Sequence, residues 1–215
     1  DPPDNYTSPV SVFLAEKSNS PVRDITDNQD LLPVRHKIDF VPSQIPESLK
    51  EAINCFILAR AIRIIRKDHG FNSSMMINVS RFTNVQNLMA DLVRRLINEY
   101  KQAISNYASL PPGEALQDSF LKALHQTWEE EFKESHTEWH DVQTALIESI
   151  RPTEVIRVNS GSTDSLNYDS IEYPKGRTVI AVGGIALSRG ITLEGLTTSY
   201  FLRNSVMYDT LMQMG

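Results

Sequence analysis

Five residues near the C-terminus have the types and the spacing of a phosphate-binding site. Gly183 and Gly184 directly follow an apolar, β-branched run at 179–182, which predicts a buried strand. The polar triplet Ser188-Arg189-Gly190 follows shortly afterwards. Glycine lets a backbone come close to a phosphate, and an arginine supplies charge-assisted hydrogen bonds to it. Because open parallel sheets bind ligands beyond the carboxyl ends of their strands, this segment predicts a ligand-binding edge.

The same segment resembles known sequence motifs. IALSRGITLEGL, at 185–196, is similar to the fifth conserved motif of superfamily-two helicases, and YDTLMQMG, at 208–215, is similar to the start of the sixth, QxxGRxxR. The combination of SRGITLEGLTTSYFLRNS with YDTLMQMG resembles the Z1 (Z-one) domain family. Members are bacterial proteins, often labelled endonucleases, in which this domain accompanies a helicase-type ATPase. The resemblance extends from about Leu49 to the last residue.

The resemblance implies a role for each matching residue. The triplet 188–190 would contact strand phosphates and the nucleotide, and Gly184 stands where many helicases carry a backbone-touching threonine. Thr192 stands where those helicases often have an aspartate for the ribose, a contact for which Glu194 is close enough to substitute. No catalytic residue is expected within the chain itself. The expected nucleotide- or nucleic-acid-binding residues are Gly183, Gly184, Ser188, Arg189, Gly190, Thr192, Glu194, Gln213 and Gly215.

The alternation of elements predicts an α/β fold. β-type runs at 75–79, 155–158, 179–182 and 197–202 are separated by helical periodicity or loops, which favours a doubly wound parallel sheet. The helicase resemblance implies that this sheet is RecA-like, as in a C-terminal helicase lobe. Polar groups at the strand ends would then converge along one edge. Weaker candidates for contact with a nucleic-acid backbone are Ser80, Arg81, Asn159, Ser160 and Arg203.

The chain divides into an arm and a lobe. Residues 1–45 are rich in Pro, Asn, Ser and Asp and predict an irregular N-terminal connector, whereas 46–215 predict the lobe. Helical periodicity fills about 84–150 without a strand, far more than one crossover needs, so we expect a helical insertion there. Thr83 with Gln86 predicts a capping box. The abrupt ends suggest an excised piece of a larger protein.

Composition limits the possible functions. The chain has 215 residues and a net charge of −6, so any contact with nucleic acid needs a local basic strip. No G-x-x-x-x-G-K-S/T motif occurs, so this is not the lobe that cradles the nucleotide phosphates, and we expect the fragment alone to be inactive.

ATP and Mg²⁺ would be bound only with a preceding ATPase lobe, and nucleic acid, taken as DNA, would be the other partner. No apolar run approaches a membrane span, and the single cysteine, Cys55, predicts a buried thiol in a reducing cytoplasm.

Three readings of the function stay open. The first is the second lobe of a DNA-dependent ATPase in bacterial restriction or phage defence. The second is the endonuclease of the family label, for which Glu131-Phe132-Lys133 has the E-x-K spacing but lies in a predicted helix. The third is an interaction module built on the helical insertion. His136 and His140 have the spacing of metal ligands on a helix without a third ligand.

One further group of residues allows two interpretations. The helix predicted after Pro46 carries four cations that lie mostly off its apolar stripe and could form a phosphate-facing strip. A solvated helix face explains them more simply, and we favour that interpretation. These cations are Arg60, Arg63, Arg66 and Lys67.

Overall fold

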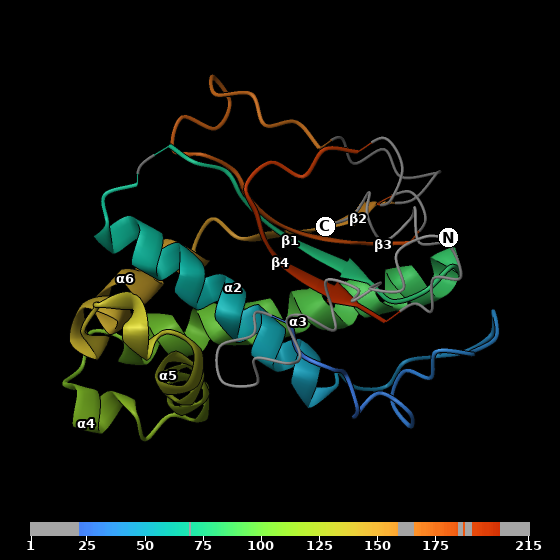
Figure 1. The fold of residues 1–215 in the computed structure, drawn as a ribbon, viewed down its shortest axis with the longest axis horizontal. Coiled ribbons are helices and arrows are strands. Elements are labelled where there is room, and N and C mark those ends of the chain that lie inside the picture. The colour runs from blue at the N-terminus through green and yellow to red at the C-terminus, as the bar shows by residue number, and fades with distance from the viewer. Residues whose placement is uncertain (1–21, 69, 159–165, 185–186, 188–190, 203–215) are drawn as a thin grey trace, which may run out of the picture.

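A four-stranded, fully parallel sheet forms the centre of the protein (Figure 1). The computed structural model describes residues 22–68, 70–158, 166–184, 187 and 191–202. The strands are β1 (Ser73–Asn78), β2 (Glu154–Val158), β3 (Thr178–Gly183) and β4 (Leu196–Phe201), in the spatial order β2-β3-β1-β4. Ile77 of β1 lies opposite Val182 of β3 and Tyr200 of β4. The predicted α/β fold with four parallel strands is therefore confirmed.

The helices are α2 (Glu47–Ile65), α3 (Thr83–Tyr107), α4 (Pro112–Ala115), α5 (Ser119–Glu131) and α6 (Trp139–Ile150), with a short 3-10 turn, η1 (Lys133–Ser135), after α5. The long helix α3 lies against β2 and β3, and α2 lies against β4. The main contacts of α5 and α6 are with α2 and α3 instead of the sheet. None of the described helices has the length and apolar character needed to cross a membrane.

The two faces of the sheet are covered differently. Met75, Ile77 and Val182 belong to the main core, which the sheet shares with the helices. The alternating neighbours in the strands, such as Met76 and Ala181, point to the other face and pack with Leu187 and loop residues. In the described part of the chain the helices lie on one face only, so the expected doubly wound arrangement is not found there. The described loop before β3, 166–177, is rich in turn-forming residues such as Asn167, Asp169, Pro174 and Gly176, which explains why no helix forms in it.

Buried polar contacts fix the helices to one another. The Tyr100 hydroxyl of α3 donates to Asn54 Oδ1 of α2, and Asn54 Nδ2 donates to Thr127 Oγ1 of α5 over 3.1 Å. Ser149 Oγ of α6 donates to the carbonyl of Ile57 in α2 over 2.7 Å. Because unpaired polar groups are costly in a core, each contact selects one arrangement of the helices.

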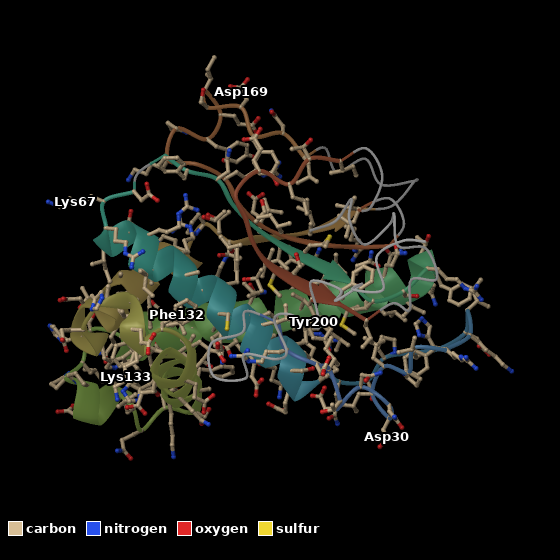
Figure 2. All side chains as sticks on the ribbon, viewed as in Figure 1. Asp30, Lys67, Phe132, Lys133, Asp169 and Tyr200 are labelled. Atoms are coloured by element: carbon tan, nitrogen blue, oxygen red, sulfur yellow. The ribbon has the colours of Figure 1, made fainter. Side chains whose placement is uncertain are left out.

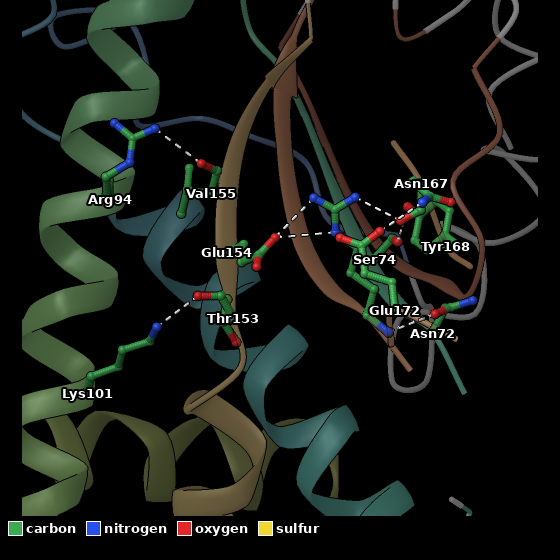
Figure 3. A network of polar contacts seen from close by, with 11 residues as sticks. Asn72, Ser74, Arg94, Lys101, Thr153, Glu154, Val155, Asn167, Tyr168 and Glu172 are labelled. Carbon is green, nitrogen blue, oxygen red and sulfur yellow. Dashed lines mark hydrogen bonds and ion pairs between the residues drawn. The ribbon is translucent and has the colours of Figure 1, made fainter. Parts of the chain in front are cut away.

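The outer edge of β2 is covered by side chains from α3 (Figure 3). Arg94 Nη2 donates to the carbonyl of Val155 over 3.1 Å, and Lys101 Nζ donates to the carbonyl of Thr153 over 2.8 Å. Carbonyls along this edge would otherwise be open to pairing with another strand. Side chains of α3 therefore occupy two of the carbonyls at this edge.

The predicted capping box at the start of α3 is wrong. The N-cap residue is Phe82, which has no capping side chain, and Thr83 is the first helical residue. Gln86 Nε2 donates instead to the carbonyl of Ser80 over 2.9 Å. The tertiary contact with the end of β1 takes the glutamine that the local motif would have used.

Candidate functional site

The carboxyl ends of the four parallel strands meet at one edge of the sheet, and Asn78 joins three of them. Asn78 ends β1, and its Nδ2 donates to the carbonyl of Gly184, just after β3, over 3.3 Å. Its own carbonyl accepts from the amide of Leu202, just after β4, over 3.0 Å. This edge, which we call the carboxyl edge, is where open parallel sheets bind ligands.

Both glycines of the predicted phosphate-binding pair are required by packing between strand ends. A Cβ at Gly183 would lie 2.3 Å from the carbonyl oxygen of Val158. A Cβ at Gly184 would lie 2.5 Å from the carbonyl oxygen of Ser80 and 2.4 Å from Gln86 Nε2. Side chains are excluded here because β3 ends in close contact with the ends of β1 and β2. Protein neighbours, without any ligand, therefore account for the glycine requirement.

Ser80 and Arg81 do lie at the carboxyl edge, but only one of them faces outward. Ser80 is 2% exposed, and its hydroxyl accepts from the amide of Phe82 over 3.0 Å. The side chain of Ser80 is thus committed to the protein and does not serve as the exposed contact expected from the sequence. Arg81 is exposed, with its guanidinium 4.7 Å from the centre of the Phe82 ring. Arg81 is the member of the pair that can reach a phosphate.

His36 is a residue at this edge that sequence reasoning missed. Its Nε2 lies 2.7 Å from Ser80 Oγ and its Nδ1 lies 2.6 Å from the carbonyl of Pro33. A carbonyl only accepts, so Nδ1 carries the hydrogen, and in the neutral ring Nε2 accepts from Ser80. The ring also contacts Phe40 and Phe82. No sequence signal linked His36 to Ser80, because the contact joins positions 44 residues apart.

The segment 22–46 is also fixed to α2 and β4. Asp27 accepts from the amide and the hydroxyl of Ser48, and Ser48 Oγ lies 2.9 Å from the Tyr200 hydroxyl. Burial raises the pKa of Tyr200 to about 12. Burial alone would raise the pKa of Asp27, but the hydrogen bonds from Ser48 outweigh it and lower the pKa. The expected irregular arm has no described helix or strand before α2, yet it packs along the carboxyl edge.

Glu194 is not brought to the carboxyl edge. Its carboxylate accepts from Asn72 Nδ2 over 2.6 Å, and its carbonyl accepts from Ser74 Oγ over 2.8 Å, so it lies where β1 begins. The chain after β3 returns across the second face, where Ile191 and Leu193 pack, before β4 starts. Thr192 is an exposed residue of this return segment. Glu194 therefore lies at the opposite end of the sheet from the glycine pair, because a parallel strand must restart at the edge where its neighbours begin.

The other expected site residues lie outside the described residues: Ser188, Arg189, Gly190, Asn159, Ser160, Arg203, Gln213 and Gly215. The described residues on either side of the 188–190 triplet are Leu187 and Ile191. Both pack against the cluster on the second face of the sheet, and Leu187 N donates to the carbonyl of Gly184 over 3.0 Å.

Comparison with known proteins identifies the family. The Z1 domain family matches residues 48–215, which is most of the chain. The chain belongs to the Z1 domain family. Neither the curated proteins nor the solved structures contain a match to it. The matched region begins at Ser48, the residue that anchors Asp27, so the segment 22–46 packs on the Z1 domain from outside the matched residues.

The Z1 domain does not place the E-x-K pair as a nuclease would. Glu131 is the last residue of α5 and pairs with Arg23 over 2.8 Å. Phe132 and Lys133 lie in the helical layer (Figure 2). His136, with a φ of 58°, ends η1, whereas His140 lies in α6, so the two histidines do not share a helix. Among the described residues, no three His, Cys, Asp or Glu side chains gather as a metal site.

The basic residues of α2 form neither a free strip nor a simple solvated face. Arg60 Nε donates to Thr178 Oγ1 over 2.8 Å, and Arg63 Nη1 donates to the carbonyl of Asn72 over 3.2 Å. Arg66 Nη2 donates to the carbonyl of Ser135 over 3.0 Å. Two of these arginines therefore fasten the end of α2 to the start of the sheet, and the third fastens it to η1. The sequence alone gave no sign of these partners.

Proposed function

We propose that this Z1 domain is the second lobe of a DNA-dependent ATPase that serves bacterial restriction or phage defence. The lobe completes an ATP site whose phosphate cradle and magnesium ligands belong to another lobe. The observation that carries the proposal is the carboxyl edge, where the exposed Arg81 follows β1 and the segment with the 188–190 triplet follows the neighbouring parallel strand β3.

The parallel sheet brings several loops together at this edge, where they can bind a partner that carries phosphates. Loops that leave neighbouring parallel strands emerge on the same side, so the 188–190 triplet follows the same strand end as Gly183. Close packing at the glycine pair fixes where that loop begins. Anchoring of a loop on a rigid sheet is what positions charged groups for phosphate recognition.

Two arginines have separate roles in the proposal. Arg189 compensates charge on the nucleotide or on strand phosphates, as arginines supplied by a second lobe do in phosphoryl transfer. Arg81 contacts the nucleic-acid backbone from the end of β1, and its stacking on the Phe82 ring holds the guanidinium in place. In this proposal the magnesium ligands come from the other lobe. ATP and Mg²⁺ therefore act only when both lobes are present.

The test uses the full-length protein that contains this chain. Arg189→Ala is expected to leave the unfolding temperature unchanged and to lower DNA-stimulated ATP turnover at least tenfold. Arg81→Ala is expected to weaken DNA binding and to make that binding less sensitive to salt concentration. The rate of ATP turnover without DNA should stay unchanged. Arg95→Ala is the matched control, because Arg95 is exposed on α3, away from the carboxyl edge. Unchanged DNA-stimulated turnover in Arg189→Ala would count against the proposal.

A further inference from the structure

A cavity of about 860 Å³ lies at the amino ends of the strands, opposite the carboxyl edge. The end of α2, the end of α6 and the turn before β3 enclose it, and Lys67 in Figure 2 marks the nearby end of α2. Its size falls within the range of small-molecule sites, roughly 300–1,000 Å³. The site and mechanism proposed above make no use of this cavity.

The walls of the cavity are held together by the backbone. Gly176, with a φ of 79°, sits in the turn before β3, and a Cβ there would lie 2.3 Å from the carbonyl oxygen of Phe71. The amide of Ser73 donates to the carbonyl of Arg177 over 2.9 Å, and the amide of Arg177 donates to Asn72 Oδ1 over 2.8 Å. Because these contacts fix both sides, the cavity is a preformed feature of the fold.

Cations outnumber carboxylates in the lining. Four cationic side chains and two carboxylates line the cavity, a surplus of two positive charges: Arg60, Arg63, Arg151 and Lys175 against Asp68 and Glu148. Asp68 is already paired with Arg63 over 3.2 Å. Burial lowers the pKa of Arg60, while the nearby Glu148 carboxylate raises it by more than the neighbouring Arg63 lowers it.

Phe71 adds an aromatic surface to the same cavity. Its side chain is 55% exposed, which core packing does not explain, and the Arg63 guanidinium lies 5.1 Å from the centre of its ring. Ile64, Ile147 and Pro174 supply further apolar lining. An aromatic ring beside several cations suits a ligand with a flat base at one end and phosphates at the other.

We propose that this amino-edge cavity binds a nucleoside diphosphate, with the phosphates between Arg151 and Lys175 and the base against Phe71. A charge surplus of two matches a ligand with two or three negative charges better than a long polyanion. The site is independent of the nucleotide that the second-lobe proposal places at the carboxyl edge, because that nucleotide needs another lobe. Binding by this chain alone therefore reports the amino-edge cavity.

The test is calorimetric titration of the 215-residue chain with ADP, pyrophosphate and adenosine. We expect saturable binding of ADP, weaker binding of pyrophosphate, and none of adenosine. Arg151→Gln combined with Lys175→Gln should lower the affinity for ADP at least tenfold. Phe71→Ala should lower the affinity for ADP severalfold and leave the affinity for pyrophosphate unchanged within twofold. Arg151, Lys175 and Phe71 are exposed, so these variants are expected to fold.

Two controls make the result specific. Lys122→Gln combined with Lys133→Gln removes the same charge from the α5 region and should leave ADP binding unchanged. Arg81→Ala, at the carboxyl edge, should also leave it unchanged. Absence of ADP binding, or equal binding by the chain and both cavity variants, would overturn this proposal and leave the second-lobe proposal untouched.

Discussion

Replacing Gly184 by alanine tests the geometry of the carboxyl edge directly. The new Cβ would lie 2.4 Å from Gln86 Nε2 and 2.5 Å from the carbonyl oxygen of Ser80, whereas ordinary contact begins near 3.4 Å. The end of β3 must therefore move by about 1 Å relative to the end of β1 and the start of α3. The clash is with backbone and with a buried amide, so it cannot be relieved by one surface rotamer.

The expected cost of this change combines two effects. Overpacking in a close-packed region costs about 1–3 kcal/mol. Displacing Gln86 also breaks its 2.9 Å hydrogen bond to Ser80, which contributes about 1 kcal/mol net. Gly184→Ala should thus lower the free energy of unfolding by about 2–4 kcal/mol. For a chain of this length, the melting temperature should fall by roughly 5–15 °C.

Gly113→Ala provides the matched control. A Cβ at Gly113, in α4, meets nothing within 4 Å, so alanine should be neutral or stabilising by up to about 1 kcal/mol. Urea unfolding of the purified chain, followed by circular dichroism, measures both variants. Equal stability of the two alanine variants would refute the close approach of β3 to β1. Gln86→Ala in the Gly184→Ala background should recover part of the loss, because one of the two clashing groups is removed.

Two further predictions concern buried groups. Tyr100→Phe leaves Asn54 Oδ1 without its donor and should destabilise the chain by about 1–3 kcal/mol, whereas Tyr107→Phe, at an exposed position, should change stability by less than about 0.5 kcal/mol in the same urea assay. Burial raises the pKa of Cys55 from 9.0 to about 12, so iodoacetamide should label it at pH 8.5 only after unfolding. The stability that Cys55 contributes is complete below about pH 9 and is lost as the pH rises towards 12, by about 3 kcal/mol at pH 11, because mainly the unfolded thiol ionises in that interval. Cys55→Ala should flatten this part of the stability profile, and an equally steep profile would contradict the assignment.

The sequence predicted the strands well because each is a short apolar run with a clear boundary. β3, for example, is flanked by Arg177 and by the glycine pair, and it was placed within one residue at each end. Local patterns also predicted the helical stripe of α3. They failed for the capping box, since Ser80 Oγ already accepts from the amide of the N-cap residue Phe82, and Gln86 Nε2 donates to the carbonyl of Ser80. The backbone N–H from which a capping glutamine would accept is thus already satisfied by a neighbouring side chain.

The candidate site was predicted only in part, because local patterns do not report which end of the sheet a residue reaches. The sequence placed Gly183, Gly184 and Arg81 at strand ends, and parallel pairing brought those ends together. The family resemblance also gave Glu194 a nucleotide contact, as a substitute for the aspartate that Thr192 replaces. The return of the chain across the second face puts Glu194 at the other end of the sheet. Which edge a residue reaches depends on strand direction, which periodicity does not report.

The sequence alone determined the parallel α/β class, the strand positions and the absence of a phosphate-cradle motif, because these depend on local composition and spacing. The order β2-β3-β1-β4, the contact of His36 with Ser80 and the basic cavity at the amino edge were decided only by tertiary structure. The physical reason is that each joins residues far apart in the chain. Their contact energies appear only after the helices and strands have packed.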